Sequence, residues 1–150
     1  MNGKDKSVIL TLGLVKVVYG LVVLCCVIAP FLVKRYDSLV VASGQESVYL
    51  PVLITLYCAV PFGVTALVCL DILLRNIRKE QPFIEQNVMM LRAISYCCFA
   101  EAVVFVYLAL LKPFAVVIII AAGFMGLILR VVKNVFEEAV RIREENDYTI

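Results

Sequence analysis

Three ionisable side chains lie inside long hydrophobic stretches of this sequence. Lys16, Asp71 and Glu101 are each surrounded by apolar residues over several helical turns. A charged side chain inside a hydrocarbon layer costs about 3 kcal/mol or more unless it is paired, hydrated or able to reach the interface. Such residues therefore act either as ion pairs that fix helix packing or as parts of a path for ions or protons.

Lys16 and Glu101 have opposite charges and a similar expected depth. Each lies about 12 Å from the same membrane face, at 1.5 Å of helix per residue. We expect both side chains to face the bundle interior and to interact, directly or through a water molecule. A single matched pair can neutralise itself, which favours a structural role, whereas a transport path is the alternative interpretation.

A second charged group is expected near the edge of the same face. Asp71 precedes Arg75 by four residues, the acid-before-base order that favours an ion pair on a helix. Arg130, at the end of another apolar run, lies at a similar depth. Small residues predict where helices pack closely. These are Gly13 and Gly20, near Lys16, and Gly126 further along the chain.

Four apolar runs supply the elements that must position these charges. The chain of 150 residues is 63% hydrophobic, with a mean hydropathy of +1.00. A helix needs about 20 apolar residues to cross a bilayer. The sequence therefore predicts a single all-α membrane domain, a four-helix transmembrane bundle in contact with the lipid bilayer. Its predicted spans are 8–33, 49–74, 91–111 and 114–132, with an outer loop at 34–48 and another loop at 75–90.

The distribution of basic residues predicts the orientation. With both termini in the cytoplasm, ten cations lie inside and three outside, apart from Lys16 within the first span. Inner loops of membrane proteins are enriched in Lys and Arg. We therefore expect the N- and C-termini in the cytoplasm. The ten inner residues are Lys4, Lys6, Arg75, Arg78, Lys79, Arg92, Arg130, Lys133, Arg141 and Arg143.

The fourth helix is expected to extend into the cytoplasm. No helix breaker occurs between Arg130 and Glu145, and apolar residues recur there at three- and four-residue spacing. The tail 133–150 ends in acids and can fold back onto the basic loop 75–90 or face a basic protein. The candidate partner-binding residues are Arg78, Lys79, Phe83, Phe136, Val140, Glu144, Glu145 and Asp147.

The composition argues against an enzyme. The chain has no histidine, and it lacks a nucleophile elbow, a glycine-rich phosphate loop and a zinc-protease motif. None of its six cysteines has CxxC spacing, so we expect small buried side chains and neither cofactor nor metal. A net charge of +2 is too small to indicate direct binding to nucleic acid.

Two segments together resemble a known family. The segment from Leu74 to Phe83, followed by Asn87 and Arg92, and the segment from Leu129 to Val140, followed by the acidic end, resemble the bacterial membrane family of domain of unknown function 2975 (DUF2975). The length and the four-span layout agree over the whole chain. The resemblance implies a fold and a bacterial cytoplasmic membrane as the location, but no established activity. Members are often encoded beside a small helix-turn-helix regulator, which implies a DNA-binding protein as partner.

The leading functional hypothesis is therefore a regulatory membrane protein that binds or sequesters a small helix-turn-helix regulator through its cytoplasmic loop and tail. One alternative is a small transporter or channel subunit, functioning as a homo-oligomer and using Lys16 and Glu101. Another is an immunity protein against membrane-active peptides that uses the outer loop.

Overall fold

The computed structural model describes residues 3–79 and 81–147, and the side chains of residues 11–79 and 81–146. These residues form four α-helices and no strand, which confirms the predicted all-α class. The helices are α1 (Gly3–Ala42), α2 (Tyr49–Arg78), α3 (Glu85–Leu111) and α4 (Ala115–Asp147).

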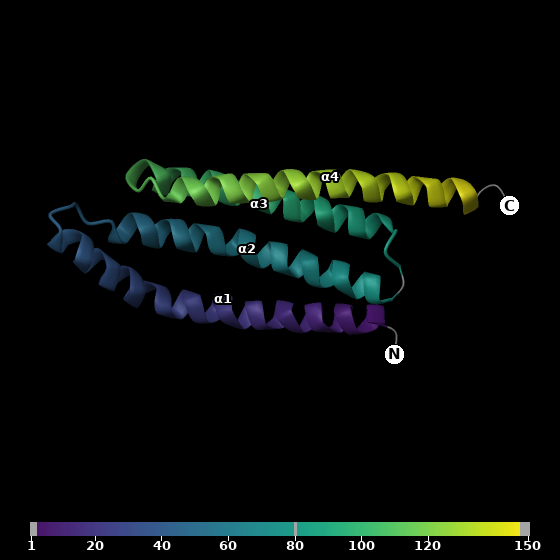
Figure 1. Cartoon of the computed structure of the whole chain (residues 1–150), viewed down its shortest axis with the longest axis horizontal. Coiled ribbons are helices and arrows are strands. Elements are labelled where there is room, and N and C mark those ends of the chain that lie inside the picture. Colours follow the sequence, from purple (N-terminus) through teal and green to yellow (C-terminus); the bar gives the residue numbers. More distant parts are fainter. Residues whose placement is uncertain (1–2, 80, 148–150) are drawn as a thin grey trace.

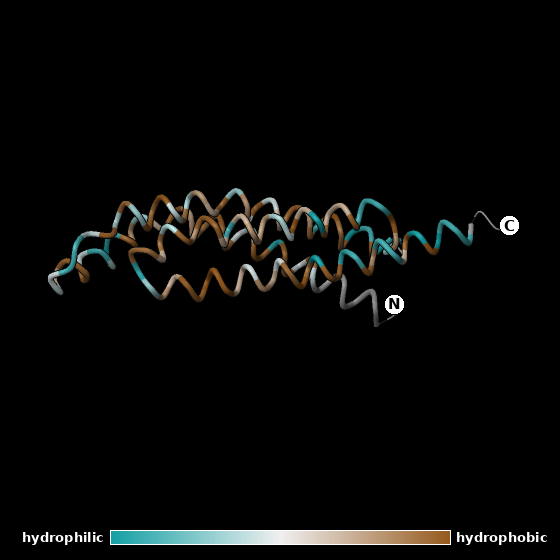
Figure 2. Tube along the Cα trace, turned by 90° about the horizontal axis from the view of Figure 1, so that it is seen from above, coloured by the Kyte–Doolittle hydropathy of each residue, from teal (hydrophilic) through white to brown (hydrophobic). Residues whose placement is uncertain are grey.

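All four helices are long and apolar enough to cross a membrane. At 1.5 Å per residue, the 33 residues of α4 are about 50 Å long, against about 30 Å of hydrocarbon. The predicted continuation of the fourth helix beyond its apolar run is therefore confirmed. Figure 2 shows hydrophobic residues along the middle of the helices and hydrophilic residues toward their ends.

Two predicted loops are shorter in the structure. The outer loop was expected to begin after Val33, but α1 continues to Ala42 and the chain turns only at Gly44, whose φ is +80°. Residues 34–42 contain no Gly or Pro that would break a helix. The Ser38 hydroxyl also donates within the helix, to the Arg35 carbonyl. The loop expected at 75–90 is likewise helical as far as Arg78 and again from Glu85. Charge alone was therefore a poor marker of where these helices end.

The helices pack in chain order. Within the described residues, α1 contacts only α2, α2 also contacts α3, and α3 packs most extensively against α4. Both termini and the connection between α2 and α3 lie at one end of the molecule (Figure 1). We call this the charged end, comprising the first turns of α1, the α2–α3 connection with its flanking turns, and the C-terminal turns of α4.

Gly126 of α4 lies in close contact with α3. A Cβ atom at Gly126 would lie 3.0–3.2 Å from ring atoms of Phe99 on α3. The Ser95 hydroxyl donates a buried hydrogen bond of 2.8 Å to the Gly126 carbonyl. Close packing is therefore found at Gly126, as expected, but not at Gly13 or Gly20, where nothing lies within 4 Å of an added Cβ.

Candidate functional site at the charged end

Two amide side chains shape the connection between α2 and α3. Asn87 is fully buried, and its amide donates to the carbonyls of Gln81 at 3.1 Å and Pro82 at 2.7 Å. The Asn76 amide donates to the Asn87 carbonyl oxygen at 2.8 Å and to Gln86 at 3.1 Å. Pro82 disfavours helix at the residue before it, so the chain must leave the helix there. The amides then satisfy the backbone groups that this turn exposes.

The C-terminal part of α4 packs onto this connection. The rings of Phe83 and Phe136 lie 5.6 Å apart between centroids, at an interplanar angle of 49°. The Arg143 guanidinium donates to the Phe83 carbonyl at 3.3 Å. Val140, one turn after Phe136, is only 7% exposed. The part of α4 beyond its apolar run is therefore held against the rest of the molecule.

An ion cluster joins α4 to α3 near this contact. Glu137 accepts from Lys133 at 2.5 Å and from Arg92 of α3 at 3.3 Å. The pKa of Glu137 lies below its usual value, mainly because Lys133 donates this hydrogen bond and also because of the charges of Lys133 and Arg92. The Glu137 and Arg92 side chains are each 52% exposed, so water screens the attraction and the pair adds little stability.

A shallow groove of about 330 Å³ runs between α3 and the end of α4. Its apolar lining comes from Val88, Met89 and Val140, with charged residues along its rims. The charged residues are Glu85, Arg92, Glu137, Arg141 and Glu144.

The predicted ion pair at the edge of α2 is present. Arg75 and Asp71 lie 2.7 Å apart, and the Asp71 side chain is only 18% exposed. Arg130 is not part of this pair. It lines a small pocket between α3 and α4 with Arg92, Ser95, Tyr96 and Lys133.

Lys16 and Glu101 are not brought together. Among the residues with described side chains no ion pair joins them, because α1 packs on α2 and does not reach α3. Lys16 lies instead near Asp71, in a pocket between α1 and α2. Glu101 faces α2, where its Oε1 is 3.3 Å from the position of a Cβ on Gly63. Similar depth in two helices does not make them neighbours.

The predicted partner-binding residues divide into accessible and covered ones. Phe83 is 42% exposed, and Arg78, Lys79, Glu144 and Glu145 lie on the surface or near it. Val140 is only 7% exposed, which leaves little of it for a partner to contact, and Phe136 is partly covered by Phe83. The side chain of Asp147 and the acidic end beyond it lie outside the described residues.

Sequence reasoning missed Asn76 and Asn87, as well as a seam on the exposed face of α4. Val131, Val135, Glu138, Ile142 and Glu145 follow one another at spacings of four, three, four and three residues. All five are exposed. The three- and four-residue spacing could have revealed this seam. The sequence-based prediction instead named Phe136 and Val140, which lie on the packed face of α4.

No group of three potential metal-binding side chains occurs in the part of the chain that the structure describes. The six cysteines are free. Cys69 and Cys97 are buried, as expected for small hydrophobic side chains, whereas Cys25 and Cys58 are exposed and Cys26 and Cys98 are partly exposed, so the prediction was wrong for these four.

Four apolar helices with one extended, charged end define a multi-pass integral membrane protein. Residues 40–150 match the family described as protein of unknown function (DUF2975), so the chain belongs to this family. The match begins at the end of α1, whereas the resemblance was expected over the whole chain. No curated protein and no solved structure matches the chain.

Proposed function

We propose that this protein is a non-enzymatic anchor in the bacterial cytoplasmic membrane that binds a small helix-turn-helix regulator at its charged end, with both termini in the cytoplasm. The observation that carries this proposal is the exposed seam on α4, defined by Val131, Val135, Glu138, Ile142 and Glu145. Spacings of four and three residues are those by which one helix packs along another.

The seam carries apolar side chains that have no cover. Val135 is 63% exposed and Ile142 is 49% exposed, in the part of α4 beyond its apolar run. Fully burying an exposed side chain of this size is worth about 1.5–3 kcal/mol, and covering the part that is still exposed gains a corresponding share. A partner helix laid along the seam would gain that free energy.

The charge of the tail favours a basic partner. From residue 133 onward, three cations face five acids, a net charge of −2 before the terminal carboxylate. An acidic helix of this kind is repelled by the anionic inner surface of a membrane. DNA-binding proteins are commonly basic. The gene association of the DUF2975 family supports a helix-turn-helix protein in particular.

The seam is also held in place before any partner binds. Phe83 packs against Phe136, Arg143 donates to the Phe83 carbonyl, and Arg92 pairs with Glu137. A surface that is fixed in advance loses less conformational entropy on binding. Sequestration at the membrane needs no catalytic group, only such a surface.

The test is a pull-down of the tagged protein from its bacterial host, with the bound proteins identified by mass spectrometry. Wild type should recover a protein with a helix-turn-helix sequence, and the double variant Val135→Glu/Ile142→Glu should lose it. The matched control Val135→Leu/Ile142→Leu keeps the seam apolar and should retain the partner. Equal recovery by all three proteins, or recovery of this chain alone, would overturn the proposal.

Transport by a small oligomer is the second candidate, and one observation favours it. Glu101 is partly buried between α2 and α3, and no ion pair to it occurs among the described residues. An ionisable group inside the membrane is by default a functional hint. Flux through proteoliposomes that the Glu101→Gln variant abolishes would support transport. Lys16 lies in the pocket between α1 and α2, so it does not support a transport path through Glu101.

A further inference from the structure

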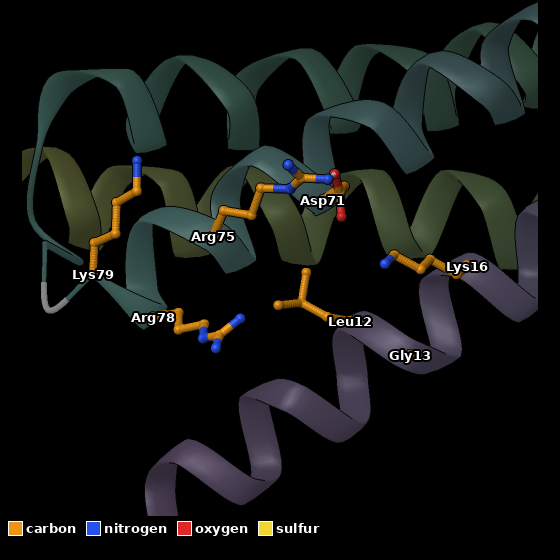
Figure 3. Close-up of a pocket in the computed structure, with 7 residues that line it drawn as sticks. All are labelled: Leu12, Gly13, Lys16, Asp71, Arg75, Arg78 and Lys79. Atoms are coloured by element: carbon orange, nitrogen blue, oxygen red, sulfur yellow. Dashed lines mark ion pairs between the residues drawn. The ribbon is translucent and has the colours of Figure 1, made fainter.

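A pocket of about 700 Å³ opens between α1 and the C-terminal turns of α2 at the charged end. Figure 3 shows the side chains of Lys16 and Arg78 pointing toward each other across this space, past Leu12. Asp71 and Arg75 lie on the α2 side of it. The complete lining is Leu12, Gly13, Lys16, Asp71, Arg75, Arg78 and Lys79.

The pocket carries an excess of positive charge. Four cations line it against one carboxylate, that of Asp71. This carboxylate is already engaged by Arg75 at 2.7 Å. Within the described side chains, Lys16, Arg78 and Lys79 have no acidic partner. The Lys79 side chain points away from this space (Figure 3), so Lys16 and Arg78 are the two cations left there to attract an anion.

An anion bound in this pocket would offset the cost of keeping these cations at the edge of the membrane. Lys16 lies inside the apolar run of α1, about 12 Å from the end of that run at 1.5 Å per residue. Arg78 follows the apolar run of α2. Like charges gathered at the edge of a hydrocarbon layer repel one another and are costly to keep there unpaired. A phosphate group would neutralise them, since the Arg guanidinium matches two phosphate oxygens at once and Lys adds a compact charge.

We propose that this pocket binds the phosphate group of an anionic phospholipid. A free phosphate ion shares the chemistry, but the surroundings favour the lipid. Val17, next to Lys16 on α1, and Val68, three residues before Asp71 on α2, are 63% and 43% exposed. Acyl chains can lie along these side chains while the headgroup stays between the helices. Basic pockets between transmembrane helices bind anionic headgroups in this way.

The test is native mass spectrometry of the detergent-solubilised full chain, titrated separately with phosphatidylglycerol, phosphatidylcholine and inorganic phosphate. Phosphatidylglycerol should bind more tightly than phosphatidylcholine. The Kd for phosphatidylglycerol should rise about tenfold in Arg78→Gln, the loss expected for one charge-assisted hydrogen bond. Lys16→Gln should weaken binding in the same direction, and Arg78→Lys, which keeps the charge, should lose less.

Arg35→Gln is the matched control, because it removes one cation from the opposite end of α1. It should leave the Kd for phosphatidylglycerol unchanged. Circular dichroism of each variant establishes that its helices are intact. Equal Kd values for the Arg78→Gln and Arg35→Gln variants would overturn the proposal, as would equal binding of the two lipids. Phosphate binding that phosphatidylglycerol cannot displace would assign the pocket to a soluble anion instead.

Discussion

Asn87 uses all of its side-chain hydrogen-bonding groups to close the connection between α2 and α3. Its oxygen accepts from Asn76, and its amide donates to two backbone carbonyls. A buried amide without such partners would cost about 1–3 kcal/mol. The shape of the charged end, including the position of Phe83 beneath α4, therefore depends on one residue that carries no charge.

Replacement of Asn87 by Leu should destabilise the protein by about 1–3 kcal/mol, because the Gln81 and Pro82 carbonyls lose their donor and the Asn76 amide loses one of its two acceptors. Thermal unfolding in detergent measures the change. Gln86→Leu is the control, since it removes one hydrogen bond at an exposed position and should have a smaller effect. Equal losses in the two variants would argue against a special role for Asn87.

Acidification should loosen the end of α4 through Glu137. The pKa of Glu137 is lowered in the folded protein, so its contribution is present above the unfolded value of about 4.3 and is lost as pH falls through the lower, folded value. Hydrogen exchange of residues 133–146 should therefore rise as pH falls below about 4, after correction for the intrinsic pH dependence of exchange.

Glu137→Gln provides the comparison for this pH effect. It should show faster exchange in the same residues at neutral pH and a weaker response to acid. The effect should be modest, because both Glu137 and Arg92 are half exposed. An identical acid response in the variant would mean that another group is responsible.

Local spacing predicted some residue contacts well and could not predict others. The Asp71–Arg75 pair follows from acid and base four residues apart on one helix. Lys16 and Glu101 were matched by depth along the helix axis, a coordinate that says nothing about which helices are neighbours. Lys16 in fact lies by α2, and Glu101 lies against Gly63 of α2.

Of the helix pairs in the described chain, α3 and α4 make the most extensive contact. It joins consecutive helices through the short turn at 112–114, and Gly126 lets the two approach closely beside Ser95 and Phe99. This packing carries α4 in a fixed direction beyond the apolar layer. The seam on α4 depends on that direction.

Gly126→Val should destabilise the protein by about 1–3 kcal/mol, because its side chain would collide with the Phe99 ring in a packed interface. Gly123→Val is the matched control, since nothing lies within 4 Å of an added Cβ there. Thermal unfolding of the two variants in the same detergent makes the comparison. A larger loss in Gly123→Val would contradict this view of the interface.

Helix number and approximate position were predictable from sequence, whereas several helix ends were not. Apolar runs of about 20 residues fix the spans because a helix of that length crosses the hydrocarbon layer and satisfies its own backbone hydrogen bonds there. Lys34 and Arg35 were assigned to a loop because they are charged, yet α1 continues through them to Ala42. Charge indicates contact with water, and a helix can continue into water until a turn residue such as Gly44 ends it.

The whole molecule has a hydrophobic body and one extended charged end, where the start of α1, the α2–α3 connection and the end of α4 lie (Figure 1). Most large hydrophobic side chains of α1 are exposed, because it packs on α2 alone. A lipid bilayer covers such a surface. The same arrangement places the pocket between α1 and α2 and the seam on α4 at one end, so a lipid and a protein could be bound there together.

The basic residues of that end predict that it faces the cytoplasm. A fluorescent protein fused after Ile150 should be fluorescent in the bacterial cytoplasm, and a periplasm-dependent phosphatase at the same position should be inactive, because Lys and Arg are retained inside. Fusion of the phosphatase within 43–48 should be active. The reverse pattern would place the charged end outside and remove it from contact with any cytoplasmic regulator.

The most direct measurement is photo-crosslinking in living cells from single positions on α4. A photoreactive amino acid at Val135 or at Ile142, both exposed on the seam, should crosslink to a small helix-turn-helix protein. The same amino acid at Val140, which is buried on the packed face of that helix, should not. Crosslinks from the seam that join only two copies of this chain, or no crosslink at all, would contradict a membrane anchor for a regulator.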